Sequence, residues 1–134
     1  MVTATIEQTL REFFATQPDG IIAAYLFGSV ARGTAGARSD VDVAVLYAAA
    51  PPATLEGWPF DLETRIGELV GRPVQVIVLN TARAGLVHRV LRDGVLLLDR
   101  APSARIRFEV RARNEFFDLQ PILARYRRRP VPTP

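Results

Sequence analysis

Residues 27–45 read FGSVARGTAGARSDVDVAV and contain the pattern that decides the fold. An apolar run over residues 21–27 ends directly before Gly28-Ser29, and a second apolar run after a glycine-rich turn carries Asp40 and Asp42. Successive side chains of a strand point to opposite faces, so the two aspartates are expected on one face, roughly 7 Å apart along the strand. The valines that alternate with them then occupy the other face and are expected to be buried.

The two aspartates need a partner of opposite charge, because close carboxylates on an apolar sheet repel each other and lose hydration. A divalent cation removes both costs, and Mg²⁺ commonly takes one or two carboxylates together with phosphate oxygens. Gly28-Ser29 suits the phosphates: it opens a helical turn with free N–H groups, and the serine hydroxyl can bond a terminal phosphate. Arg32 and Arg38 flank this turn and could balance phosphate charge. The pattern therefore predicts a site for Mg²⁺ and a phosphorylated ligand.

Apolar runs and segments of helical periodicity alternate along the rest of the chain. Continuous apolar runs are typical of strands covered by helices, so the sequence predicts an α/β (α+β) domain with a long C-terminal helix. The expected order is a helix from Thr3 or Thr5, a strand at 21–27, a short helical turn closed by Gly33, a strand at 41–47, a helix at 60–70, a strand at 74–79, a helix from about 81 to 93, a strand at 95–98, and a helix from about 102 that Pro121 should kink or divide.

Length and composition exclude several classes of protein. The chain of 134 residues suits one domain. It has no cysteine and one histidine, His88, which excludes disulfides, thiolate catalysis and a multi-histidine metal site within one chain. No apolar stretch approaches the roughly 18 residues that span a bilayer, and the N-terminus lacks the features of a signal peptide. A cytoplasmic protein without membrane contact is therefore expected.

Charge is unevenly distributed along the chain. All 17 basic residues are arginine, and 9 of them follow residue 99, against 3 acidic residues in the same segment. A basic C-terminal segment fits RNA, a phosphorylated ligand or an acidic protein partner, and charge alone does not choose among these.

The spacing Gly28-Ser29, ten residues, Asp40-Val41-Asp42 resembles the signature of the DNA polymerase β-like nucleotidyltransferases, and the fuller string resembles their minimal nucleotidyltransferase (MNT) subgroup. The resemblance implies a nucleotidyltransferase fold with a small mixed sheet covered by helices. It implies an MNT core over residues 1–100, with residues 101–134 as a basic helical extension of the same domain. It also implies that Asp40 and Asp42 are catalytic and ligate Mg²⁺, and that Gly28 and Ser29 hold the phosphates of ATP.

The C-terminal stretch RFEVRARNEFFDLQPILARYRRR, residues 107–129, resembles MNT antitoxins encoded beside HEPN-domain toxins. Members of that family transfer AMP from ATP to a tyrosine of the HEPN ribonuclease and silence it. The resemblance thus implies a HEPN toxin as partner in a hetero-oligomer, with ATP as the nucleotide, and no direct binding of nucleic acid is expected.

One position departs from the family pattern. The superfamily usually places a third carboxylate on a neighbouring strand, and the matching position here is Gln75. Adjacent strands lie about 4.8 Å apart, so Gln75 is expected to face Asp40 or Asp42. An amide carbonyl can ligate a metal, but it brings no charge and cannot act as a base. Two alternatives therefore stay open: an antitoxin that acts by binding alone, and a small-molecule nucleotidyltransferase subunit.

Overall fold

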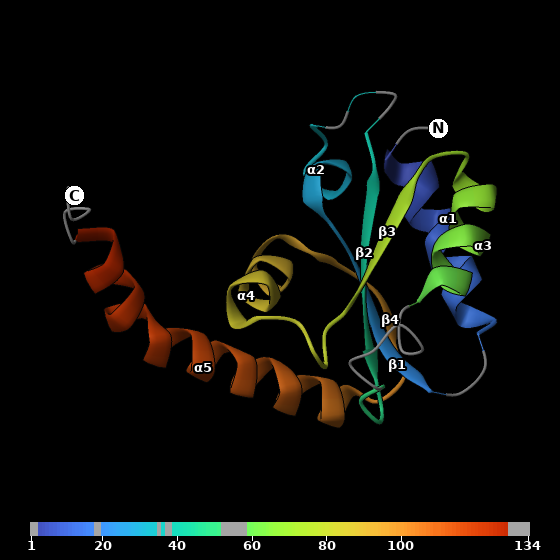
Figure 1. Cartoon of the computed structure of the whole chain (residues 1–134). Helices are drawn as coiled ribbons and strands as arrows, with labels where there is room; N and C mark the ends of the chain where they lie inside the picture. The colour runs from blue at the N-terminus through green and yellow to red at the C-terminus, as the bar shows by residue number, and fades with distance from the viewer. Residues whose placement is uncertain (1–2, 18–19, 35, 37–38, 52–58, 129–134) are drawn as a thin grey trace.

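The computed structural model describes residues 3–17, 20–34, 36, 39–51 and 59–128 (Figure 1). Helices and strands alternate along the chain, and the shortest of the helices, α2, separates the first two strands. The elements are α1 (Thr3–Ala15), β1 (Ile21–Phe27), α2 (Gly28–Ala31), β2 (Val41–Tyr47), α3 (Phe60–Val70), β3 (Val74–Val78), α4 (Ala84–Asp93), β4 (Val95–Asp99) and α5 (Pro102–Arg128).

The four strands form one sheet in the order β3-β2-β1-β4. β1 pairs antiparallel with both β2 and β4, whereas β2 and β3 run parallel. The expected small mixed sheet covered by helices is therefore confirmed. The parallel pair requires a crossover, and α3 provides it between the two strands.

Each face of the sheet has its own hydrophobic core. Val41, Val43 and Val45 are fully buried on the face covered by α1 and α3, as the alternation in β2 predicted. Ala44 and Leu46 point to the other face, which packs against α4 and the first half of α5. Burial of both faces explains why β1 and β2 read as continuous apolar runs.

Polar and aromatic contacts attach the first half of α5 to the body. The Tyr25 hydroxyl donates a hydrogen bond of 2.7 Å to Glu109, whose second carboxylate oxygen accepts one of 3.1 Å from Arg105. His88 of α4 stacks on Phe116, with ring centroids 3.8 Å apart. Figure 1 shows the second half of α5 extending away from the sheet and the other helices.

Several boundaries differ from the sequence prediction. α4 begins at Ala84 instead of about residue 81, because residues 79–82 form a turn in which Thr81 and Ala82 donate to the carbonyls of Val78 and Leu79. β4 extends to Asp99, which pairs with Ala23. Pro121 does not divide α5, so that part of the prediction is wrong: the residue is exposed, and water can satisfy the carbonyl group that a proline leaves without a helical donor. Within the described residues, no helix is long and apolar enough to cross a membrane.

Candidate functional site

The strand register gathers the sequence-predicted residues at one end of the sheet. Phe27, the last residue of β1, lies opposite Asp42 of β2, and Asp42 lies in register with Gln75 of β3. Gly28 follows Phe27 directly and begins α2. Three neighbouring strands thus bring Gly28, Asp42 and Gln75 side by side, although they are separated by up to 47 positions in sequence.

Gly28 is packed directly against the Asp42 carboxylate. A Cβ atom placed on Gly28 would lie 2.2 Å from Asp42 Oδ2 and 3.1 Å from its Cγ, closer than two such atoms can approach. The residue also has a φ angle of 77°, in the left-handed region that side chains disfavour. Both observations favour glycine here: a side chain would displace the neighbouring carboxylate, and the turn from strand to helix needs a left-handed backbone.

The environment of Asp42 is unfavourable for a negative charge. Partial burial raises the pKa of its carboxyl group, and the nearby Asp40 carboxylate raises it further, while Arg32 opposes both effects. Asp40 directly precedes β2 and is exposed. Within the described residues, no group of three or more histidine, cysteine and acidic side chains could hold a metal.

α2 presents a short helical turn beside these carboxylates. Its preceding residue, Phe27, has extended backbone angles, and the Arg32 N–H donates to the Gly28 carbonyl at 3.1 Å. Thr34 then fixes the exit of the turn, since its N–H donates to the Ser29 carbonyl at 3.0 Å. Ser29 is half-buried at the start of this turn, where helical N–H groups lack intrahelical acceptors. Arg38 lies outside the described residues.

Gln75 lies on β3, the edge strand of the sheet, and is exposed. Register partners in a parallel pair project to the same face, so its amide projects on the side of Asp42. The structure thus brings Gln75 next to Asp42 while leaving the amide accessible to solvent and ligands.

Sequence reasoning missed the end of α4 as part of this region. Leu26 pairs with Val95, which places the α4–β4 junction beside the end of β1. A hydrogen bond from Arg92 lowers the pKa of Asp93, and Arg32 and Arg89 lower it further. Arg32 therefore acts electrostatically on carboxylates of both β2 and α4. Only the pairing of β4 with β1 reveals this proximity, and nothing in the local sequence signals it.

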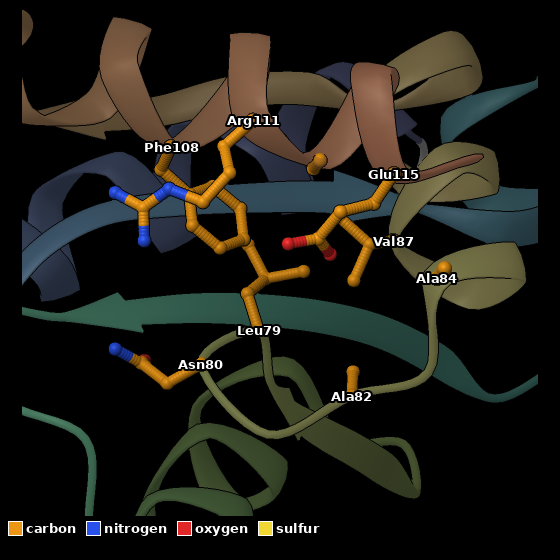
Figure 2. A pocket seen from close by; sticks show the side chains of 9 residues that line it. Leu79, Asn80, Ala82, Ala84, Val87, Phe108, Arg111 and Glu115 are labelled. Atoms are coloured by element: carbon orange, nitrogen blue, oxygen red, sulfur yellow. The ribbon is translucent and has the colours of Figure 1, made fainter. Parts of the chain in front are cut away.

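A small cavity lies at the opposite end of the sheet (Figure 2). It has a volume of about 130 Å³ and lies between the end of β3, the start of α4 and α5. Figure 2 shows Phe108, Arg111 and Glu115 reaching from α5 toward Leu79 and Asn80. Sites for drug-sized ligands usually measure about 300–1,000 Å³, so this cavity is too small for a nucleotide. The carboxylate end of the sheet remains the candidate functional site.

Comparison with known proteins bears on the same residues. Residues 8–103 match the family model for polymerase beta nucleotidyltransferases, which covers most of the chain and all the described site residues. The chain belongs to this nucleotidyltransferase family. No curated protein sequence matches it.

Solved structures share the fold of this nucleotidyltransferase. A chain in the crystal structure of a toxin–antitoxin with AMP-PNP matches with a TM-score of 0.73 at 22% identity, covering 90% of this chain and 97% of that chain. A chain in the crystal structure of the toxin–antitoxin MntA-HepT matches with a TM-score of 0.67 at 19% identity, covering 92% and 97%. A third chain, from the tri-AMPylated Shewanella oneidensis HEPN toxin in complex with MNT antitoxin, gives 0.69 at 19% identity, covering 93% and 98%. At these identities the likeness establishes the fold.

Proposed function

We propose that this chain is an MNT-type antitoxin that transfers AMP from ATP to a tyrosine hydroxyl of a partner HEPN toxin. The observation that carries the proposal is the close packing of Gly28 against the Asp42 carboxylate, at the start of the α2 turn. Membership of the nucleotidyltransferase family supports the class of chemistry. Structures of toxin–antitoxin complexes that share the fold, one with AMP-PNP and one with an AMPylated toxin, favour ATP and a HEPN partner.

The carboxylates suit a divalent cation that arrives with the nucleotide. Partial burial and the Asp40 charge both disfavour the ionised form of Asp42, and a bound cation reverses this preference. We assign Asp40 and Asp42 as ligands of Mg²⁺, with the phosphate oxygens of ATP completing its coordination. When bound, Mg²⁺ would neutralise charge that develops on the triphosphate.

Residues of the turn would hold the triphosphate. The N–H groups at the start of α2 and the Ser29 hydroxyl can donate to phosphate oxygens. Because Gly28 has no side chain, the phosphates can approach the backbone next to Asp42. Arg32, exposed at the end of the turn, would supply positive charge to the terminal phosphates. Arg38 is assigned the same role from its place in the sequence.

In the transfer step, the acceptor oxygen forms a bond to the α-phosphorus and the bond to the bridging oxygen of pyrophosphate breaks. The acceptor proton passes to solvent or to a carboxylate, and pyrophosphate leaves. Gln75 has no charge and cannot accept this proton. Its carbonyl can instead orient the acceptor or the cation beside Asp42, with which it is in register.

Labelling with α-³²P-ATP and Mg²⁺ tests this proposal. The acceptor would be the purified protein encoded by the adjacent gene, with wild type compared with Asp42→Asn and Gln75→Asp. Labelling by wild type that disappears with Asp42→Asn is the expected result. Labelling that survives Asp42→Asn would contradict the assigned role of this carboxylate.

A second candidate is an antitoxin that neutralises its partner by binding alone, and the amide at position 75 favours it. If wild type forms a stable complex without labelling, and Gln75→Asp restores labelling, this candidate replaces the first. A small-molecule nucleotidyltransferase subunit would need an acceptor pocket, and the described cavity lies at the wrong end of the sheet for that purpose.

A further inference from the structure

α5 has a second apolar face that the fold does not use. Ile106, Val110 and Phe117 are 49%, 49% and 57% exposed, although they are large apolar side chains. Their spacing of four and seven positions places them on one side of the helix. We call these three residues the outer stripe. Arg113, also exposed, lies in the same row between Val110 and Phe117.

The inner face of α5 fixes the orientation of this stripe. Ala112 is buried against α4 and the sheet, and Phe116 stacks on His88. Glu109 accepts hydrogen bonds from both Tyr25 and Arg105, and Arg105 also forms an ion pair of 3.0 Å with Asp99. Turning the helix to bury the outer stripe would break all of these contacts. The stripe therefore faces away from the body of the protein.

The charges around the stripe indicate what could cover it. Arg107 and Arg113 border it and form no ion pair with any residue that the structure describes. Among the acidic residues beside the row, Glu109 is engaged by Tyr25 and Arg105, whereas Asp118, which follows Phe117, is exposed. Arg113 lies within the row itself, so two copies of the chain meeting stripe to stripe would each bury an arginine without a described carboxylate partner, which is unfavourable. The complementary surface is therefore apolar with an acidic border.

The length of α5 also favours a partner that binds to this helix. The helix has 27 residues, which is about 40 Å at 1.5 Å per residue, and Figure 1 shows the ribbon of its second half extending away from the sheet and the other helices. A helix without tertiary contacts is only marginally stable in water. Phe117 lies at the start of this half, so a partner that contacts the outer stripe and continues along the helix would stabilise this half as well.

We propose that the outer stripe is the docking surface for the partner toxin, which would present an apolar surface bordered by acidic side chains. This inference rests on the proposed function for the identity of the partner. It adds the surface of this chain that binds the partner, on the side of α5 turned away from α4.

Binding measurements on matched variants test the docking surface. Val110→Glu and Phe117→Glu place carboxylates in the stripe, while Leu69→Glu changes an apolar side chain of similar exposure, 50%, on α3. The probe is the purified protein encoded by the adjacent gene, with affinity measured by biolayer interferometry. We expect each stripe variant to weaken binding at least 30-fold and Leu69→Glu less than 2-fold. Arg113→Glu should weaken binding about 10-fold at low salt, and less at high salt.

The outcomes separate this inference from the proposed chemistry. Circular dichroism and thermal melting of the free variants verify that the fold is intact. Stripe variants that bind like wild type overturn the docking surface, as does a wild-type protein that does not bind the probe. A wild-type homodimer that Phe117→Glu dissociates, or a wild type that binds RNA through α5 instead, overturns it too. Stripe-dependent binding without transfer of label would leave the docking surface standing and contradict the transfer chemistry alone.

Discussion

Gly28→Ala should separate the effect of the Asp42 contact from the effect of backbone strain. The new Cβ would lie 2.2 Å from Asp42 Oδ2, whereas ordinary contact begins near 3.4 Å. The nearest oxygen of the carboxylate must therefore move by about 1.2 Å to reach ordinary contact. A misplacement of about 1 Å in a catalytic group costs roughly 100-fold in rate. We expect at least this loss of nucleotidyl transfer.

Gly33→Ala is the matched control. Gly33 has a φ angle of 72°, close to the 77° of Gly28, but nothing lies within 4 Å of its added Cβ. An alanine in the left-handed region costs about 1–2 kcal/mol, so both variants should lose this stability. For a domain of this size each kcal/mol lowers Tm by about 3–6 °C. The clash at Gly28 adds little more, because the side chain of Asp42 can rotate away.

The assay pairs thermal melting, alone and with ATP and Mg²⁺, with the transfer of label. Both variants should melt at similar temperatures without ligand. Gly33→Ala should keep the stabilisation by ATP and Mg²⁺, and Gly28→Ala should lose it. Equal loss of ligand stabilisation in both variants, or full retention in Gly28→Ala, would refute the role assigned to the Gly28–Asp42 contact.

Three further predictions concern single side chains. Because burial and a neighbouring carboxylate raise the pKa of Asp42, ionising it opposes folding, and this cost disappears as pH falls toward the ordinary value of 3.8. Asp42→Asn should therefore melt higher than wild type at pH 7 without metal, with the difference shrinking toward pH 4; a constant difference would contradict the pKa shift. Gln75→Asp should lower Tm without metal and increase the Tm gain from Mg²⁺, which melting curves with and without Mg²⁺ measure; an unchanged gain would show that position 75 lies too far from the cation. Tyr25→Phe leaves Glu109 Oε1 without its donor and should cost about 1–2 kcal/mol in urea denaturation. Tyr47→Phe removes the hydroxyl of a half-buried side chain for which no hydrogen bond to a described residue is seen, so it should cost clearly less, and equal costs would contradict the importance of the Glu109 contact.

Local sequence predicts the strands of this fold well because hydrophobic burial determines them. The bounds of β1 and β2 follow from two continuous apolar runs, and the burial of Val41, Val43 and Val45 follows from the alternation around Asp42. The start of α4 at Ala84 was harder to predict from the sequence, because hydrogen bonds in the preceding turn determine it.

The candidate site was only partly predictable. The sequence motif predicted that Gly28-Ser29 lies near Asp42. How closely Gly28 approaches the Asp42 carboxylate depends on the register of β1 with β2, which the spacing in the sequence does not determine. The proximity of Asp93 to Arg32 depends on β4 pairing with β1, a contact between segments far apart in sequence. Tertiary pairing, not local pattern, supplied these features.

β1 connects two parts of the molecule that have separate proposed roles: α5, which would bind the partner, and the turn at Gly28, which would bind the nucleotide. Tyr25, in the middle of this strand, holds Glu109 of α5, and Gly28 begins only three residues later, about 10 Å along the chain. This strand, paired on both sides within the sheet, thus links the proposed docking helix to the proposed phosphate-binding turn. If partner binding shifts α5 and β1 passes this shift to the proposed nucleotide site, the affinity for ATP changes, and thermodynamic reciprocity then requires ATP to change the affinity for the partner by the same factor.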